Sequence, residues 1–594
     1  MWLPRAEHPR PQFRRGRWLN LNGRWDFDFD FGLSVEEHGW RRGILPDAST
    51  LKKKILVPFC PESKLSGIGY TGFIPAVWYH RTFQIPPEWQ GQRVILNFGA
   101  VDYGCRAWVN GCFVGRHLGG SSSFGFDISN AVRQGENQLV VNARDDVGSG
   151  LQPCGKQSRS LRSSGACYTR TTGIWQTVWL EVLPDRAIES VRIVADLDTA
   201  RFVLTPALTR AARGLRFRAT LFDGDRRLTT AQVPAASGVS MALKIQDPKP
   251  WSCSRPHLYD LRFELVDGEE ILDSVDSYAG LRKFHVEGNR FFLNNQTIFL
   301  RFVLDQGFYP RGVWTAPGDE DLKADIERAQ ALGFNGARLH QKVFEERFHY
   351  WADRLGYLTW AEFPDWGLDF GHTEAVQNHQ REWREVVLRD LNHPSIVGWT
   401  PFNETLDHAR RHPEVHRQAL QEIGRLTRAL DPTRPVHDVS GYVHVCTDIF
   451  SVHDYGQDHD SLRNRYAGVS PGTPAQAFVR FSELSAPYEG QPYVVDEYGG
   501  TWWAEGGQGA GTDRESGWGY GDRPESIEEV HERIENLTSV LTAHPHIAGY
   551  AYTQLTDIEQ EQNGLYTYDR RLKFDPERLR RAFGAPAVIE EAGD

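Results

Sequence analysis

Long apolar runs are missing from this sequence of 594 residues. No stretch reaches the roughly 18 apolar residues of a membrane-spanning helix. The first twenty residues also lack the apolar run of roughly 7–15 residues that a signal peptide needs. Blocks of Lys and Arg are missing too, and the formal net charge is −11. These absences predict a protein that has neither a membrane nor a nucleic acid as its partner.

Cysteine is scarce, with seven residues that are odd in number, scattered and without a CxxC pair. This pattern predicts reduced thiols in a cytoplasmic protein, and it contains no metal-ligand cluster. No strand-like run is followed by GxGxxG, and a Walker-type loop is absent, so nucleotide cofactors are not indicated. We therefore expect neither a cofactor nor a metal.

Aromatic residues, in contrast, are plentiful, with 19 Trp and 20 Tyr. Aromatic faces pack against the C–H faces of sugar rings, although large β proteins also use Trp as core filler. The length exceeds the roughly 250–300 residues at which one hydrophobic core stops growing, so two to four domains are expected.

The chain divides into three regions that differ in their pattern of apolar residues. Residues 1–184 contain many short runs rich in β-branched and aromatic residues, with a hairpin predicted at 109–111, and they predict a β jelly roll. Residues 185–284 show strand-like runs at the spacing of an immunoglobulin-like β-sandwich. From 285 to 594, close to eight apolar runs alternate with amphipathic segments, which favours a C-terminal (β/α)8 TIM barrel over a doubly wound sheet.

Two carboxylates stand where barrel enzymes place their catalytic groups, at the carboxyl ends of strands. Glu404 closes WTPFNE and Glu497 closes PYVVDE, the expected fourth and seventh strands. Such a pair can hydrolyse a glycoside, one carboxylate attacking the anomeric carbon while the other protonates the leaving oxygen. Asn403, directly before Glu404, can hydrogen-bond a sugar hydroxyl beside the reacting centre. Acidic residues at strand ends are also common helix caps or ion-pair partners.

Several motifs in this order resemble glycoside hydrolase family 2, the family of β-galactosidases, β-glucuronidases and β-mannosidases. The resemblance covers nearly the full length, through LNGRWDF at 21–27, FGAVDYGCRAWVNGCFVGRHLGG at 98–120, GIWQTVWLE at 173–181 and, in the barrel, NGARLH, HPSIVGWTPFNE and VVDEYGG. It implies a retaining exo-β-glycosidase that releases terminal sugars through a covalent glycosyl-enzyme.

The resemblance also implies roles for single residues. It makes Glu404 the acid/base and Glu497 the nucleophile, with Arg338 keeping the nucleophile ionised and Tyr455 hydrogen-bonding it. From their places near strand ends, sugar contacts are further expected of His340, His453, Trp502, Trp503, Gln554 and Asp557. Each of these side chains also has a purely structural interpretation, as a core aromatic or an ion-pair member.

The sequence departs from the family pattern at a position that bears on the substrate. Relatives that act on glucuronides carry an Asn-x-Lys motif whose Lys pairs with the uronate, whereas Glu561 and Asn563 stand there in this chain. An acidic group would repel a carboxylate, so a neutral sugar is predicted, with β-galactoside leading and glucuronide, arabinoside and mannoside as alternatives. A clear Glu-x-His partner for a divalent ion is also missing.

Other possibilities remain at this stage. A catalytically inactive carbohydrate-binding protein would bind the same sugars, and a transglycosidase would share the covalent intermediate. The polar segment 152–172 is expected to reach the barrel mouth and contact the substrate, through Tyr168 or Arg170. The carbohydrate substrate is the expected partner, and a homo-oligomer is left open.

Overall fold

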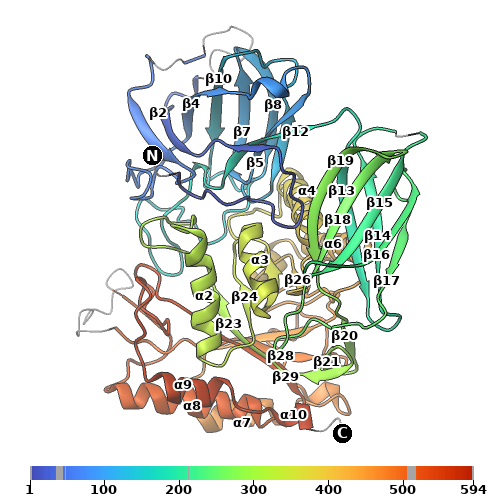
Figure 1. Cartoon of the computed structure of the whole chain (residues 1–594). Coiled ribbons are helices and arrows are strands. Elements are labelled where there is room, and N and C mark those ends of the chain that lie inside the picture. The colour runs from blue at the N-terminus through green and yellow to red at the C-terminus, as the bar shows by residue number, and fades with distance from the viewer. Residues whose placement is uncertain (1–2, 35–44, 47–48, 212, 505–516, 592–594) are drawn as a thin grey trace.

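The computed structural model describes residues 3–34, 45–46, 49–211, 213–504 and 517–591 (Figure 1). The predicted order of jelly roll, immunoglobulin-like sandwich and barrel is confirmed. In Figure 1 the first sandwich lies above the barrel, and the second lies beside both. Among the described residues, no helix is both long and apolar enough to cross a membrane.

The first sandwich packs two main sheets around one hydrophobic core. Every second side chain of strand β5 is buried, as expected for a strand with one face against the core. The six-stranded sheet contains, in spatial order, β3 (Lys53–Val57), β2 (Gly23–Phe29), β4 (Ala76–Gln84), β10 (Glu136–Arg144), β7 (Gly104–Val109) and β8 (Cys112–Leu118). The four-stranded sheet contains β1 (Trp18–Asn20), β12 (Val178–Leu183), β5 (Arg93–Phe98) and β9 (Phe124–Asp127), and a small pair joins β11 (Gly173–Ile174) to β6 (Val101–Asp102).

The predicted hairpin at 109–111 joins β7 to β8. Val109 pairs with Cys112 across the turn, and the two residues between them have φ values of 50° at Asn110 and 80° at Gly111. Asn and Gly tolerate this left-handed backbone better than other residues do, and its twist matches that of the flanking strands.

The second sandwich pairs a three-stranded sheet with a four-stranded one. Strand β14 alternates strictly between buried and half-buried residues, so one of its faces belongs to the core. The sheets are β13 (Ile188–Asp196), β14 (Arg201–Leu208) and β17 (Met241–Lys244), and β16 (Arg226–Pro234), β15 (Arg216–Asp223), β18 (Tyr259–Asp267) and β19 (Glu270–Ala279). A small sheet of β20 (Phe284–Glu287), β21 (Arg290–Leu293) and β22 (Gln296–Ile298) follows.

Seven parallel strands form most of the barrel wall. They are fully or almost fully buried because helices cover their outer side and side chains fill the interior. In chain order they are β23 (Leu300–Asp305), β24 (Gly336–Leu339), β25 (Leu358–Glu362), β26 (Ile396–Thr400), β27 (Phe450–Asp454), β28 (Tyr493–Gly499) and β29 (Ile547–Thr553).

Residues 436–440 occupy the remaining position in the wall, between β26 and β27. Isolated parallel bridges join Trp399 to Val436 and Asn403 to Ser440. Toward β27, however, the contact is made by side chains, since His437 Nε2 lies 2.7 Å from Ser451 Oγ. The predicted fifth strand is therefore present as a bridged segment instead of a regular ladder.

Helices alternate with the barrel strands and cover the barrel. Helix α8 is representative, because Val530, Ile534, Leu537 and Leu541 are buried at the spacing of one helical face. The helices are α2 (Asp319–Ala331), α3 (Glu346–Leu355), α4 (Thr373–Asp390), α5 (Leu406–Arg411), α6 (Pro413–Leu430), α7 (His459–Tyr466), α8 (Ile527–Thr542), α9 (Pro576–Phe583) and α10 (Val588–Glu591), with short 3-10 turns η2 (Pro87–Trp89) and η3 (Pro474–Gln476).

Buried polar contacts fix the second sandwich on the barrel. The indole of Trp251 donates to the carbonyl of Asp353 at 2.6 Å, and Arg282 donates to the carbonyls of Pro394 and Ile396 at 2.9 and 2.7 Å. Because all of these side chains are buried, the orientation of the sandwich is defined by specific hydrogen bonds as well as by apolar packing.

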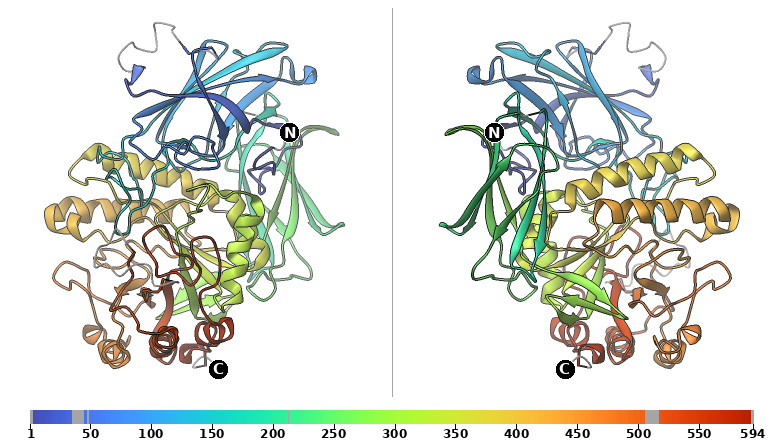
Figure 2. Two further views of the ribbon diagram at one scale, coloured as in Figure 1. Left: turned by 90° about the vertical axis from the view of Figure 1, so that its left-hand side faces the viewer. Right: turned by 90° about the vertical axis from the view of Figure 1, so that its right-hand side faces the viewer.

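The segment 145–172 of the first sandwich, which includes the stretch 152–172 predicted to do so, reaches the barrel mouth (Figure 2). The amide of Cys154 donates to the carbonyl of Trp366 at 2.8 Å, and the carbonyl of Gly150 accepts from the amide of Asp369 at 2.8 Å. Further along the segment, the hydroxyl of Tyr168 donates to Glu561. The rim of the barrel is thus built partly by the sandwich.

Candidate active site

Glu404 and Glu497 face each other at the carboxyl end of the barrel. Glu497 lies within β28, and Glu404 follows β26 by four residues. His453 lies between them, with Nδ1 at 2.7 Å from Glu404 Oε1 and 3.2 Å from Glu497 Oε2. The nearest atoms of the three side chains all lie within 4.8 Å of one another. This upper limit agrees with the short carboxylate separation of retaining glycosidases, ~5–5.5 Å, and is below the ~6.5–9.5 Å of inverting ones.

The backbone at Glu404 is left-handed, with a φ of 51°. This conformation costs a non-glycine residue of order 1–3 kcal/mol and persists only where its surroundings hold it in place. Here the amide of Glu404 donates to the carbonyl of Ser440 at 3.0 Å. The bridged segment 436–440 therefore fixes the turn that carries this carboxylate.

Arg338, at the end of β24, connects the two sides of the site. It is fully buried, and it donates to Glu497 Oε1 at 2.6 Å and to Glu362 Oε2 at 2.7 Å. Its remaining nitrogen lies 2.7 Å from Asn403 Oδ1 and 2.9 Å from His340 Nδ1. The expected contact between Arg338 and Glu497 is thus present.

Asn403 and His340 keep donors directed away from Arg338. The Nδ2 atom of Asn403 is buried and has no hydrogen-bond partner among the described residues. His340 accepts from Arg338 through Nδ1, and burial together with the Arg338 charge lowers its pKa well below the ordinary range. A neutral imidazole that accepts at Nδ1 carries its proton on Nε2, so both side chains can donate to a ligand.

Three tyrosines surround the carboxylates. The hydroxyl of Tyr455 donates to Glu497 Oε2, and its ring stacks on Tyr520 with centroids 3.4 Å apart. Tyr442 interacts with Glu404, and burial followed by this contact raises the pKa of its hydroxyl. Tyr455 is among the predicted residues, whereas Tyr442 and Tyr520 are not, because each lies in a loop without a strand pattern to mark it.

The surroundings of both carboxylates favour their ionised forms. Burial alone would raise their pKa values, but His453 and Lys156 together lower the pKa of Glu404 to about 2. His453 and Arg338 likewise outweigh burial and lower the pKa of Glu497. In return, Glu497, Asp496 and Glu404 overcome the burial of His453 and raise its pKa. The central imidazole therefore holds a proton between two carboxylates.

The same three side chains form the one group of possible metal ligands among the described residues. Their atoms, however, contact one another, since His453 Nδ1 lies 2.7 Å from Glu404 Oε1 and 3.2 Å from Glu497 Oε2. The raised pKa of His453 also favours the imidazolium form, which has no lone pair for a metal.

The remaining predicted residues lie in different surroundings. Gln554 accepts from Gln306 at 2.7 Å and donates to Asn563 Oδ1 at 2.9 Å. Asp557 instead accepts from Lys573 Nζ at 2.9 Å. Trp502 lies under Arg523, whose guanidinium is 5.2 Å from its ring, and Trp503 packs against the barrel core. Gln554 thus joins the polar groups of the mouth, while the contacts of Asp557 and Trp503 are structural.

A second polar group, the Glu561 cluster, consists of Gln306, Tyr168, Gln554, Glu561 and Asn563. Glu561 accepts from the hydroxyl of Tyr168 and, at 3.0 Å, from Asn563 Nδ2. Burial raises the pKa of this carboxyl, and nearby Lys156 partly opposes that rise. Of the two loop residues expected to contact substrate, Tyr168 reaches this cluster. Arg170 instead donates to carbonyls of Ser158, Ser160 and Thr71 and supports the loop itself.

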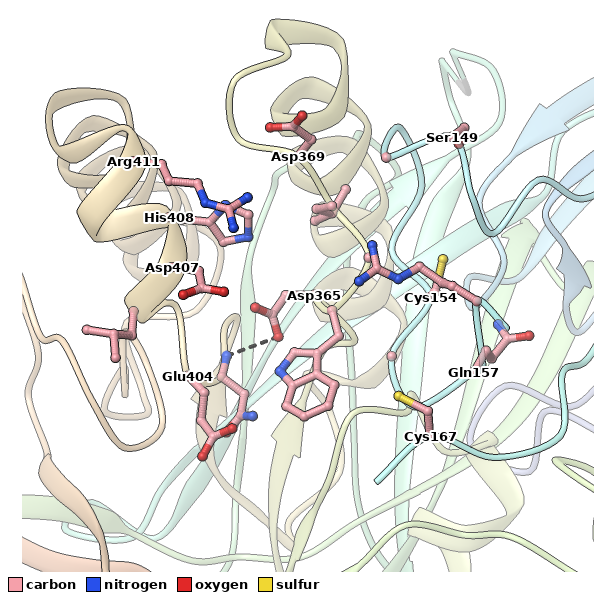
Figure 3. A pocket seen from close by; sticks show the side chains of 18 of the residues that line it. Ser149, Cys154, Gln157, Cys167, Asp365, Asp369, Glu404, Asp407, His408 and Arg411 are labelled. Carbon is pink, nitrogen blue, oxygen red and sulfur yellow. Dashed lines mark hydrogen bonds between the residues drawn. The ribbon is translucent and has the colours of Figure 1, made fainter. Parts of the chain in front are cut away.

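A cavity of about 660 Å³ opens beside Glu404 (Figure 3). Asp407, His408 and Arg411 of α5 line one side of it, and Ser149, Cys154 and Gln157 of the sandwich loop line the other. Trp366 and Tyr442 also line it. Its walls carry many charged and hydroxyl groups, and such a lining suits a polar ligand.

Three segments of the chain match known families. Residues 69–151 match the sugar binding domain of glycosyl hydrolases family 2, residues 187–282 match glycosyl hydrolases family 2, and residues 284–516 match the TIM barrel domain of the same family.

Individual relatives are more distant. A beta-glucuronidase of Paenibacillus borealis is 23% identical over 599 residues, which cover 95% of this chain and 96% of that protein. A beta-galactosidase of Thermoanaerobacter pseudethanolicus is 26% identical over 376 residues, which cover 61% of this chain and 48% of that protein. Some relatives are thus much longer than this chain, the matches covering 38% and 48% of two of them.

The fold recurs in solved structures. The crystal structure of the beta-glucuronidase of Ruminococcus gnavus superposes with a TM-score of 0.78 at 19% identity, covering 98% of this chain and 99% of that one. At this level of identity, the likeness concerns the arrangement of the three domains.

Proposed function

Because the chain belongs to glycosyl hydrolase family 2, we propose that it is a retaining exo-β-glycosidase with Glu497 as nucleophile and Glu404 as acid/base. The observation that carries this proposal is the opposed pair of carboxylates, whose nearest atoms lie within 4.8 Å of each other. In the first step Glu497 attacks the anomeric carbon while Glu404 protonates the leaving oxygen. In the second, Glu404 takes a proton from water, which then releases the sugar.

The surrounding groups support these two roles. Arg338 and Tyr455 both donate to Glu497, which keeps it ionised and holds it in one orientation. His453 supplies the proton that Glu404 delivers, because its Nδ1 lies 2.7 Å from Glu404 Oε1. A sugar bound over Glu404 removes water from the carboxylate, which raises its pKa and favours this transfer.

Asn403 and His340 are assigned to the sugar. Asn403 Nδ2 is a buried donor without a partner among the described residues, and a hydroxyl of the bound sugar would satisfy it. Gln554, Tyr520 and Trp502 are assigned to the outer wall of the same pocket. The domains are assigned as 1–184, 185–284 and 285–594, with the loop of the first narrowing the barrel mouth so that one terminal sugar fits.

A neutral terminal sugar is favoured, with β-galactoside as the first candidate. Glu561 and Asn563 stand where a uronate-binding Asn-x-Lys motif is expected, and Glu561 is already bonded to Tyr168 and Asn563. A sugar carboxylate placed beside it would add a second negative charge. The relatives named above include both beta-glucuronidases and a beta-galactosidase, so β-glucuronide is the alternative to test.

The decisive experiment uses p-nitrophenyl β- and α-glycosides of galactose, glucose, glucuronate, mannose and arabinose. We expect one β-glycoside to be cleaved with retention, and we expect Glu497→Ala to abolish turnover. Glu404→Ala should lower kcat/KM by about 10²–10⁴-fold on leaving groups that need protonation. Azide should rescue the two variants differently, giving the α-glycosyl azide with Glu497→Ala and the β-glycosyl azide with Glu404→Ala.

Three results would contradict the proposal. Full activity of Glu497→Ala would remove the nucleophile assignment. Sugar binding without cleavage, with Glu404→Gln changing only affinity, would identify a carbohydrate-binding protein. Predominant transfer to added sugar acceptors would identify a transglycosidase.

A further inference from the structure

Lys156 is a buried cation that the sandwich loop delivers to the barrel mouth. The residue is only 6% exposed, and its backbone carbonyl accepts a hydrogen bond from the amide of Tyr168 at 2.7 Å. The ammonium lies 3.7 Å from the ring centre of Trp366. Trp366 lines the same cavity as Glu404, so Lys156 stands at the edge of the catalytic site.

The ammonium of Lys156 is incompletely satisfied. It carries three N–H donors, yet within the described ranges it forms no hydrogen bond and no ion pair, and it lies over the face of Trp366. A charge on a largely buried side chain loses much of its hydration, and an indole ring compensates only part of that loss. An oxygen-bearing ligand would supply the missing acceptors.

Two carboxylates lie within electrostatic range of this ammonium. The Lys156 charge helps to lower the pKa of Glu404, and it partly opposes the burial that raises the pKa of Glu561, although it forms an ion pair with neither. Glu561 is held in place from behind by Tyr168 and Asn563. Tyr168 connects the two residues, because its amide donates to the carbonyl of Lys156 and its hydroxyl donates to Glu561. A cation beside the cavity wall and a fixed acceptor are thus held by the same part of the loop.

We infer that Lys156 is a specificity-determining residue, and that together with Glu561 it binds neighbouring hydroxyl groups of the terminal sugar. The inference rests on the proposed glycosidase function and extends it to the choice of sugar. Lys156 donates to the oxygen of one hydroxyl, while Glu561 accepts the proton of the next. Their opposite charges cancel, so a neutral diol fits, whereas a uronate would stand beside the carboxylate of Glu561.

The test compares Lys156→Met with the wild type and with Arg162→Met, which removes an exposed cation from the same loop. Each is assayed on the best p-nitrophenyl glycoside and on its analogues that lack single ring hydroxyls. We expect Lys156→Met to lower kcat/KM by about 10–100-fold, the effect of one charge-assisted hydrogen bond. With the wild type, removing the hydroxyl that Lys156 binds should lower kcat/KM by the same factor. With Lys156→Met, removing that hydroxyl should lower kcat/KM no further. Arg162→Met should behave as the wild type.

Glu561→Gln supplies an independent check. It should lower kcat/KM mainly for substrates that carry the neighbouring hydroxyl. In the double variant with Lys156→Met, the two losses of transition-state stabilisation should be less than additive, because both residues bind one diol. Circular dichroism and the thermal midpoint confirm that each variant is folded.

Failure of this inference differs from failure of the proposed function. Unchanged discrimination among the deoxy analogues in Lys156→Met would overturn the inference while leaving the hydrolase intact. A wild-type preference for a β-hexuronide that disappears in Lys156→Met would also overturn it, because Lys156 would then bind a carboxylate. If the wild type cleaves no glycoside, calorimetric titration of wild type and Lys156→Met with free galactose and glucuronate decides the role of Lys156.

Discussion

Arg338 uses all three nitrogens of its guanidinium inside the site, on Glu362, Glu497, Asn403 and His340. The family resemblance predicts this residue, and its place near a strand end agrees with the prediction, because consecutive barrel strands deliver their last side chains to one rim. Lys156, Tyr442 and Tyr520 have no comparable signal. They lie on loops, and which loop residue reaches the rim depends on tertiary packing that a local pattern does not encode.

The pH dependence of catalysis should be governed by His453. Its pKa is raised by the surrounding carboxylates, so it stays protonated above its ordinary value of 6.5 and loses the proton as the pH rises further. Glu404 and Glu497, with lowered pKa values, stay ionised well into the acid range. We expect wild-type kcat/KM to fall on the alkaline side as His453 deprotonates.

His453→Gln checks this assignment. Gln keeps hydrogen bonding but holds no charge, so the alkaline limb due to His453 should disappear. The acid limb should move upward, because both carboxylates lose the cation that lowers their pKa, and kcat/KM should fall by about 10²-fold or more. An unchanged pH profile of kcat/KM would contradict the role of His453.

At the scale of elements, the sequence predicts the barrel strands well, because buried parallel strands are continuous apolar runs. The segment 436–440 deviates for a visible reason. Asp438 Oδ2 accepts from the amides of Val445 and Cys446 at 2.6 and 2.8 Å. This side chain satisfies the backbone of the following loop, and the segment consequently joins β27 through side chains instead of a ladder.

The loop 145–172 is fixed at two separate points, at Trp366 through Cys154 and at Glu561 through Tyr168. We expect Tyr168→Phe to leave the fold intact and to lower kcat/KM by about 10–100-fold, because the carboxylate of Glu561 loses a buried donor. Tyr70→Phe, at an exposed tyrosine of the same sandwich, is the control for kcat/KM and for the thermal midpoint. Equal kcat/KM values in both variants would show that the hydroxyl of Tyr168 does not orient Glu561.

At the scale of the whole molecule, Arg15 joins the two sandwiches. It donates to Asp273 of β19 at 2.9 and 3.0 Å and to Glu181 of β12 at 3.4 Å, and all three side chains are buried. The order of the domains is predictable from sequence. This contact is not, because Glu181 and Asp273 lie 166 and 258 positions from Arg15 along the chain.

Arg15→Met should therefore destabilise the assembly of domains. It leaves two buried carboxylates without their cation, which costs about 3–5 kcal/mol. Its neighbour provides a matched control, since Arg14 pairs with Asp276 at 3.7 Å with side chains 57% and 44% exposed. Arg14→Met should change the free energy of unfolding by less than about 1 kcal/mol. Urea unfolding of both variants tests the comparison, and similar midpoints would contradict it.

Because the 145–172 loop reaches the barrel from the first sandwich, the residues around the barrel mouth are encoded in two distant parts of the gene. Lys156 and Tyr168 are encoded with the first sandwich, whereas Glu404 and Glu497 are encoded with the barrel, more than 200 codons downstream. If the proposed roles hold, a library confined to this short stretch would vary which glycoside is accepted while the proposed catalytic carboxylates stay constant. Recombination between related genes upstream of the barrel would then exchange sugar preference in a single event.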